Sequence, residues 1–211
     1  MYFRILHDES TGELTYLLSD LESKEAVLID PRSRDVNVLS ALLDERELQL
    51  KWILRTHHHD HLHPENVLKL HQLGAPLVQG DGLDQSYRFD GELLPFGSEA
   101  VRVLVTPGHT PSCLSFHWRD RLFCGGLLAV CDCPDQPYAE MPEQLWESVM
   151  GRVFKLPNET LLFSGHAQRL RTVSTVMDQR RWHPSFTGLN RDEFLESMVK
   201  ITDNAKLQAA L

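Results

Sequence analysis

The sequence predicts an α/β fold in which strands and helices stack as a four-layer αββα sandwich. Both halves of the chain place short apolar strands before an amphipathic helix, which is the pattern of two sheets each covered by helices on one side. Three predicted strands also end in a turn that carries histidine. With 211 residues, of which 42% are hydrophobic, the chain can bury a large core. We expect a single domain over residues 1–211.

The N-terminal half is predicted to contain a hairpin, a helix, a strand and a second helix. Leu14–Leu18 and Glu25–Pro31 are short β-type runs joined by a polar turn and closed by proline. Asp35–Leu48 has apolar residues at mostly helical spacing, and Leu50–Leu54 returns as a buried strand. Pro64 suits the first turn of the helix that follows.

The C-terminal half repeats this scheme with more strands. A hairpin is predicted around residues 119–120, and a helix precedes the last predicted strand. The predicted strands are 76–78, 100–105, 114–118, 121–123 and 160–163, and the predicted helices are 144–156, 172–181 and 191–207.

The segment Thr56–His63 holds five histidines and one aspartate within eight residues, at the end of a predicted strand. Alternate side chains of an extended segment point the same way, so His57 and His59 can bind one metal ion while Asp60 and His61 turn toward a second position. A surface histidine run is the alternative, but such runs are typical of termini, whereas this one lies between a strand and a helix. We therefore predict a metal site.

The net charge and the cysteine content indicate which partners and which cellular compartment to expect. The formal net charge of −9 argues against a nucleic acid or an anionic membrane as a partner, because both favour a basic surface. The N-terminal residues match no targeting peptide, and no apolar run is long enough to span a bilayer. Four cysteines without a signal peptide are expected to be reduced thiols. We expect a cytoplasmic protein.

Several motifs in order along the chain resemble the metallo-β-lactamase superfamily, and within it the persulfide dioxygenase group related to glyoxalase II. The resemblance covers nearly the whole chain and implies a four-layer αββα metallo-β-lactamase sandwich with a metal site at one edge. It depends on Thr15–Leu18, Glu22–Pro31, the histidine run, Thr106–Pro111 with Cys113, and His166 followed by Thr172–Val176.

The resemblance also implies how the separated histidines meet. His57, His59 and His109 would form the first metal set, whereas Asp60, His61 and His166 would form the second, with Asp60 as the candidate catalytic residue. A mononuclear site with open positions would take Fe(II) or Zn(II), one ion per chain. The implied partner is a small-molecule thiol or thioester substrate. The oligomeric state stays open, a homo-oligomer included.

Two features of the metal motifs depart from the family. The run after Thr56 is one residue shorter than the family pattern; we anchor it at Thr56 and His57, although anchoring at Asp60 and His61 would instead align Thr56 and His58 with the first two ligands. Gly126 stands where the family has a metal-bridging aspartate, so a carboxylate restored there is expected to strengthen metal binding. Nearby residues could substitute, but Cys-x-Cys spacing alone is a weak metal signal, and we interpret these cysteines as apolar fillers and loop thiols. The candidates are Cys124, Cys131, Asp132 and Cys133.

The expected substrate-binding residues also differ. The family's arginine in the loop after the bridging aspartate is absent from Cys131–Asp135, and its tyrosine after the last histidine is Gln168. The sequence therefore favours a persulfide dioxygenase-like enzyme with an altered metal and substrate site. A glyoxalase II-like thioester hydrolase and a non-catalytic metal- or thiol-binding relative are the alternatives.

Overall fold

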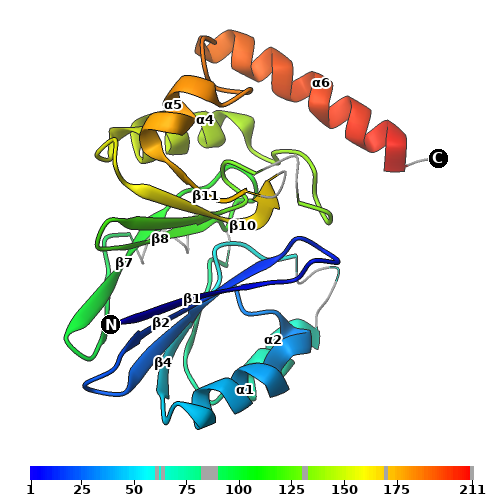
Figure 1. Ribbon diagram of the computed structural model, residues 1–211. Helices are drawn as coiled ribbons and strands as arrows, with labels where there is room; N and C mark the ends of the chain where they lie inside the picture. The colour runs from blue at the N-terminus through cyan, green and yellow to red at the C-terminus, as the bar shows by residue number, and fades with distance from the viewer. Residues whose placement is uncertain (60–61, 63–64, 82–89, 130–132, 169–170, 210–211) are drawn as a thin grey trace.

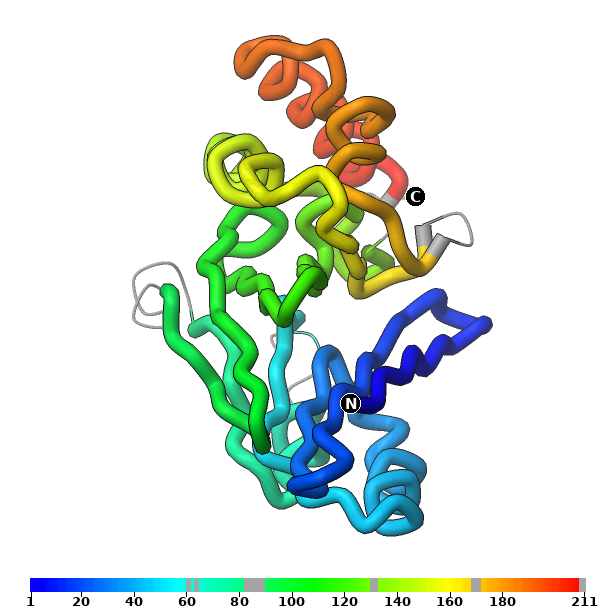
Figure 2. Tube along the Cα trace, turned by 60° about the vertical axis from the view of Figure 1, so that its left-hand side comes forward, coloured from blue at the N-terminus to red at the C-terminus, as the bar shows by residue number. Residues whose placement is uncertain are grey.

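The computed structural model describes residues 1–59, 62, 65–81, 90–129, 133–168 and 171–209. Two mixed β-sheets face each other, and helices cover the outer side of each sheet (Figure 1). In Figure 2 the blue and cyan N-terminal half lies below the orange and red C-terminal segments, and the green strands connect the two. The layers therefore run helix, sheet, sheet, helix, which confirms the predicted αββα sandwich.

The N-terminal sheet contains five strands in the order β1-β2-β3-β4-β5. The first three are antiparallel, whereas β4 and β5 each join in parallel because a helix makes the return. Those helices are α1 (Val36–Glu45) and α2 (Glu65–His71), and α1 packs Leu39 and Leu42 against the outer face of the sheet. The strands are β1 (Tyr2–His7), β2 (Leu14–Asp20), β3 (Glu25–Ile29), β4 (Gln49–Leu54) and β5 (Leu77–Val78).

The C-terminal sheet contains six strands in the order β11-β10-β9-β8-β7-β6. Antiparallel hairpins connect β6 to β9, and β10 then joins β9 in parallel after helix α4 (Pro142–Gly151) and the 3-10 turn η4 (Val153–Lys155). The strands are β6 (Leu93–Phe96), β7 (Glu99–Val105), β8 (Leu114–Trp118), β9 (Arg121–Gly125), β10 (Leu161–Gln168) and β11 (Arg171–Thr175).

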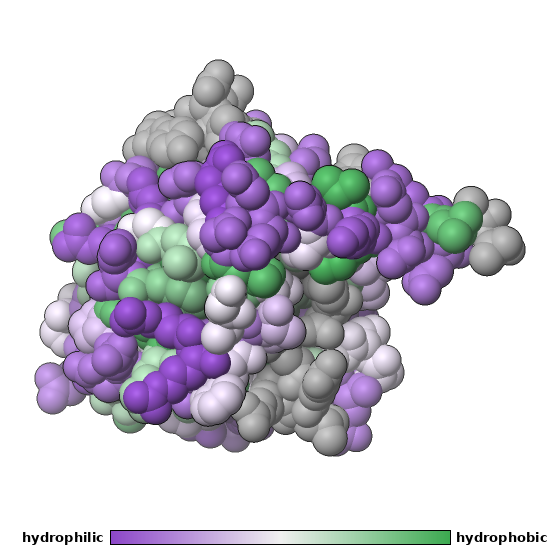
Figure 3. Space-filling model, turned by 90° about the horizontal axis from the view of Figure 1, so that it is seen from above, coloured by the Kyte–Doolittle hydropathy of each residue, from purple (hydrophilic) through white to green (hydrophobic). Residues whose placement is uncertain are grey.

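Helices α4, α5 (Val176–Trp182) and α6 (Arg191–Ala209) form the outer layer over this sheet (Figure 1). Helix α6 buries Phe194 and Met198 against that layer and leaves Val199 exposed. Its projecting end is largely hydrophilic, with hydrophobic residues interspersed (Figure 3). Among the described residues, no helix combines the length and hydrophobicity needed to cross a bilayer.

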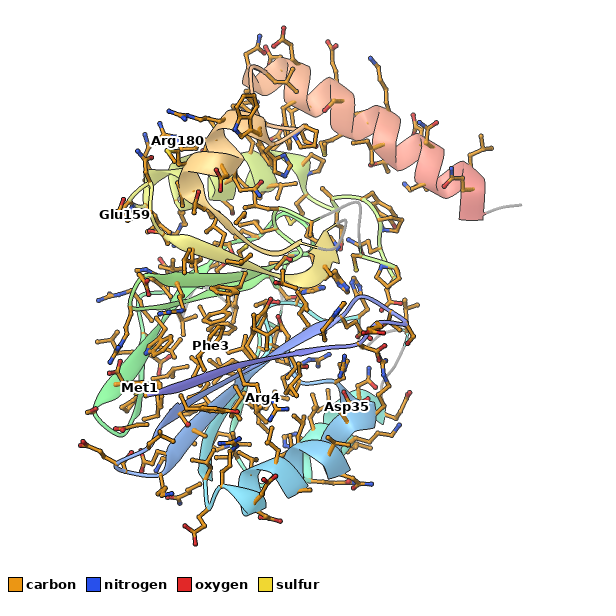
Figure 4. The ribbon with its side chains drawn as sticks, viewed as in Figure 1. Met1, Phe3, Arg4, Asp35, Glu159 and Arg180 are labelled. Carbon is orange, nitrogen blue, oxygen red and sulfur yellow. The ribbon has the colours of Figure 1, made fainter. Side chains whose placement is uncertain are left out.

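The space between the sheets is filled by aromatic side chains. Phe3 of β1 points into it (Figure 4), and its ring centroid lies 5.3 Å from that of Phe163. The rings of Tyr16 and Phe123 meet with centroids 4.9 Å apart. Interlocked rings of this kind hold the two sheets in one register. The strand ends of both sheets therefore meet at a fixed edge.

Two element predictions were wrong. Residues 172–175 belong to strand β11, not to a helix, because this β-branched run pairs antiparallel with β10. The helix begins one residue later, and Thr175 caps it by accepting a hydrogen bond from the backbone N–H of Asp178. Strand β6 was missed since Pro95 lies inside it, and proline is tolerated there because β6 is an edge strand.

Candidate metal centre

The histidine run begins directly after β4, and Thr56 fixes its start. The Thr56 backbone N–H and hydroxyl both donate to the carboxylate of Asp30, each at 2.7 Å. Asp30 follows β3, the parallel neighbour of β4, and burial raises its pKa to about 6. The backbone carbonyl of Thr56 accepts a hydrogen bond from Leu114 of the opposite sheet. The first histidine is thus held at the junction of both sheets.

This network also sets the tautomer of His57. The single hydroxyl proton of Thr56 goes to the Asp30 carboxylate, so the oxygen accepts from Nδ1–H of His57, 3.0 Å away. Nδ1 therefore carries the proton, and Nε2 of His57 is left with a lone pair for a metal.

His109 reaches the same place from the loop between β7 and β8. Its Nε2 lies 3.0 Å from the carbonyl oxygen of Gln136, which can only accept, so Nε2 carries the proton. The Gln136 side-chain amide donates back to the His109 carbonyl at 2.6 Å. The remaining ring nitrogen, Nδ1, is buried and has no hydrogen-bond partner among the described residues. A buried lone pair of this kind fits a cation.

Three glycines let the rings approach the backbone. A Cβ on Gly126 would lie 2.4 Å from Nδ1 of His109, and one on Gly125, where φ is +53°, would lie 2.1 Å from the Thr56 hydroxyl. Gly165 is less tight, with its Cβ position 3.2 Å from Cε1 of His57. The ring of His109 thus fills the space that a side chain at Gly126 would need.

The histidines form two overlapping groups of metal-ligand type. The ligand atoms of His57, His59 and His109 all lie within 4.8 Å of one another, and so do those of His57, His166 and Cys133. His166 comes from the end of β10, and its ring centroid is 5.6 Å from that of His57.

The other residues of the histidine run are not placed in the ligand groups. His58 is in neither group, since its Nε2 lies 2.8 Å from the carbonyl oxygen of Gly80. Asp60 and His61 lie outside the described residues. The arrangement favours the register anchored at Thr56 and His57.

The sequence missed the position of Cys133. Its sulfur lies 3.3 Å from Nε2 of His59, and the side chain is buried. Burial raises the pKa of the thiol to about 11. The sequence signal at this position is the Cys-x-Cys spacing, whose interpretation as apolar fillers and loop thiols does not place Cys133 beside His59. The supporting residues Asp30 and Gln136 were also missed, although Asp30-Pro31 at a strand end is a usable signal.

Burial keeps these imidazoles neutral. Desolvation, followed by the neighbouring His109 and His166, lowers the pKa of His57 well below its usual value. Desolvation likewise lowers the pKa of His109 to about 4, against the opposing effect of its bond to Gln136. Neutral imidazole is the form that binds metals, so both side chains are ready for an ion at neutral pH.

A cavity of about 440 Å³ opens onto this cluster. His57, His59, His166 and Cys133 line it, together with Asp135. Three arginines also line the wall. Arg32 pairs with Asp35, and Arg34 pairs with Asp8 and Glu13. Arg55 donates to the side-chain oxygen of Gln79 at 2.9 Å. The cavity is large enough for a small-molecule substrate.

A four-layer αββα sandwich with a histidine cluster at the edge where the strand ends meet defines the metallo-β-lactamase superfamily. The persulfide dioxygenase ETHE1 of Bos taurus, a mitochondrial protein, is 34% identical over 205 residues, covering 94% of this chain and 80% of the relative. The crystal structure of ETHE1 from Myxococcus xanthus superposes with a TM-score of 0.79 at 30% identity, covering 96% of this chain and 95% of that one.

The chain belongs to the persulfide dioxygenase family of that superfamily. A hydroxyacylglutathione hydrolase of Bartonella tribocorum is also similar, at 33% identity over 77% of this chain and 61% of its own length. No family model matches the sequence.

Proposed function

We propose that this chain is a metal-dependent enzyme that acts on a small thiol substrate, of the persulfide dioxygenase kind. The observation that carries the proposal is the convergence of His57, His59 and His109 with ligand atoms within 4.8 Å. The buried lone pair on Nδ1 of His109 supports a donor set that accepts a cation. A bound Fe(II) or Zn(II) would supply Lewis-acid activation and a template for the substrate thiolate.

The chain's own residues would prepare the site for that ion. The Asp30–Thr56 pair holds the proton of His57 on Nδ1, and the Gln136 carbonyl holds that of His109 on Nε2. Both lone pairs are thereby oriented before an ion arrives, which lowers the free-energy cost of ordering the side chains on metal binding. His61 and His166 are the remaining ligand candidates of the proposal, and Asp60 is its catalytic candidate.

We expect at most one ion per chain. His57 belongs to both ligand groups, but its Nδ1 donates to Thr56, which leaves one nitrogen for a metal. Gly126 supplies no bridging carboxylate that would hold two ions close together. Two tightly held ions per chain would contradict this.

The test begins with elemental analysis of protein purified without a histidine tag. His57→Ala and His109→Ala should each lose most of the bound metal. His58→Ala is the matched control, because His58 is in the same run but contacts Gly80, and it should keep the metal. Retention of full metal content by His57→Ala would contradict the proposed site.

Activity is measured as oxygen uptake with glutathione persulfide and an iron-loaded sample. Uptake that His57→Ala abolishes supports the dioxygenase reaction. The glyoxalase II-like alternative, favoured by the hydroxyacylglutathione hydrolase relative, predicts thiol release from a glutathione thioester instead. Metal binding with neither reaction would support the non-catalytic alternative. A cytoplasmic location belongs to the same proposal, to be tested by fractionation.

A further inference from the structure

The thiol of Cys133 lies among the proposed ligands. Its Sγ is 3.3 Å from Nε2 of His59, and it forms one of the two ligand groups with His57 and His166, all within 4.8 Å. Cys133 is only 1% exposed, yet it lines the wall of the cavity that reaches the histidines. Zinc binds sulfur at about 2.3 Å and nitrogen at about 2.0 Å, so donors at these separations can contract onto one ion.

The other described cysteines show what a structural thiol looks like in this fold. Cys113 interacts with the backbone N–H and hydroxyl of Thr110, each at 3.2 Å. Cys124 donates to the carbonyl of Phe163 at 3.4 Å. Neither is in a ligand group, whereas the sulfur of Cys133 lies against the imidazole of His59 as well as the backbone N–H groups of Asp135 and Gln136. Cys133 thus differs from both in the chemistry around its sulfur.

The charge of the site gives this thiol a role. Among the described residues, the two ligand groups contain histidine and cysteine but no carboxylate. The family's carboxylate would stand at position 126, where this chain has Gly126, and the ring of His109 fills the space that a side chain there would need. A divalent ion held by imidazoles alone would keep its full charge in a buried site. A thiolate ligand would halve that charge.

We propose that Cys133 binds, as a thiolate, the single ion held by His57 and its neighbouring histidines, replacing the missing carboxylate and making the site prefer Zn(II) to Fe(II). The inference rests on the proposed metal centre. Adding a sulfur to the imidazole nitrogens softens the ligand set, and thiolate selects zinc over iron(II) at sites of comparable geometry. Binding transfers the thiol proton to solvent, so one proton is released for each ion taken up.

Cobalt(II) is the probe, because it replaces zinc and gives a thiolate-to-metal charge-transfer band in the near ultraviolet. The unmodified, untagged protein titrated with Co(II) should show this band and saturate at one ion per chain. Cys133→Ser should lose the band and bind Zn(II) at least about tenfold more weakly, since even outer-shell changes cost about 10–100-fold. Cys124→Ser is the matched control and should keep the band.

The outcomes separate this inference from the proposed function. Cobalt bound without a charge-transfer band would overturn the thiolate ligand and leave the histidine site standing. A band that persists in Cys133→Ser would also overturn it. No cobalt binding at all would overturn both. If Cys133→Ser does not fold, alkylation of the unmodified protein is the test. Zn(II) should protect Cys133 from iodoacetamide, as measured by peptide mass mapping. Equal labelling with and without Zn(II) would refute the inference.

Discussion

Gly126→Ala tests how tightly the His109 ring is fitted to the backbone. An ideal Cβ at position 126 lies 2.4 Å from Nδ1 of His109, whereas ordinary contacts begin at 3.4 Å, so the ring must retreat by about 1 Å (3.4 − 2.4). Overpacking of a buried site costs about 1–3 kcal/mol. For a chain of this size each kcal/mol lowers Tm by about 2–4 °C. We expect the metal-free variant to melt about 2–12 °C lower.

Metal binding should weaken in the same variant. A ring displaced by about 1 Å no longer aims its lone pair at the ion, and losses of about 10–100-fold in affinity follow from comparable disturbances of a ligand's orientation. The measurement is competition for Zn(II) against a chromophoric chelator, alongside thermal melting followed by circular dichroism.

Gly151→Ala is the matched control for this experiment. Apart from its chain neighbours and the backbone of its own helix, no described heavy atom lies within 4 Å of its Cβ position, and the residue ends helix α4. The change should leave metal affinity alone and raise stability by up to about 1 kcal/mol. If Gly126→Ala melts and binds zinc like the unmodified protein, the close approach of His109 to Gly126 is not a property of the protein.

The position of the His109 ring also changes the effect expected of Gly126→Asp. Aspartate at position 126 was expected to strengthen metal binding by adding a carboxylate. Its Cβ would meet the same ring, so the gained oxygen is offset by the displaced nitrogen of His109.

Three further predictions follow from the site. Thr56→Val removes the hydroxyl between Asp30 and His57, so it should lower the free energy of unfolding in a urea titration by about 1–3 kcal/mol and zinc affinity by about 10–100-fold. Unchanged affinity would show that the hydroxyl does not orient the ring. In metal-free protein, burial depresses the pKa of His57 and lowers that of His109 to about 4, so the unfolded chain binds more protons than the native one below pH 6.5. Stability measured by thermal melting should therefore fall as the pH drops from 6.5 toward 4, although Asp30, with its pKa raised to about 6, acts in the opposite sense. Stability that rises with acidification would contradict the histidine effect. Asp135→Arg places a guanidinium on the cavity wall. It should raise kcat/KM for glutathione persulfide by about 10–100-fold, mainly by lowering KM, because a charged hydrogen bond contributes about 1.5–3 kcal/mol. An unchanged KM would mean that the substrate binds elsewhere.

Hydrophobic periodicity was enough to predict most of the fold. The hairpin of β2 and β3, the helix α1 and the strand β4 were predicted from apolar spacing, because each buries one face against a neighbour. Residues 172–175 show the limit of that method. A short run next to a helix carries little periodicity, and only pairing with β10 makes it a strand. The extent of the single domain stays a prediction.

The site was less accessible from sequence. Histidine spacing indicated a metal, and the structure brings His57, His59, His109 and His166 together, although their individual roles stay predictions. The position of Cys133 against His59 depends on how the loop before α4 folds back over 74 residues of sequence separation, which no local pattern encodes. The sequence indicated that Gly126 lacks the family's carboxylate, but it did not indicate that the ring of His109 occupies that space.

The residues of the centre come from both halves of the sandwich, since His57 and His59 follow a strand of one sheet, and His109 and His166 come from the other. An ion bound there would act as a cross-link between layers that otherwise meet through side-chain packing and a few hydrogen bonds, such as that from Leu114 to the carbonyl of Thr56. Binding only the assembled state, it would stabilise the fold in proportion to the logarithm of its concentration. Metal supply in the cell would then set the fraction of this protein that is folded as well as the fraction that carries an ion.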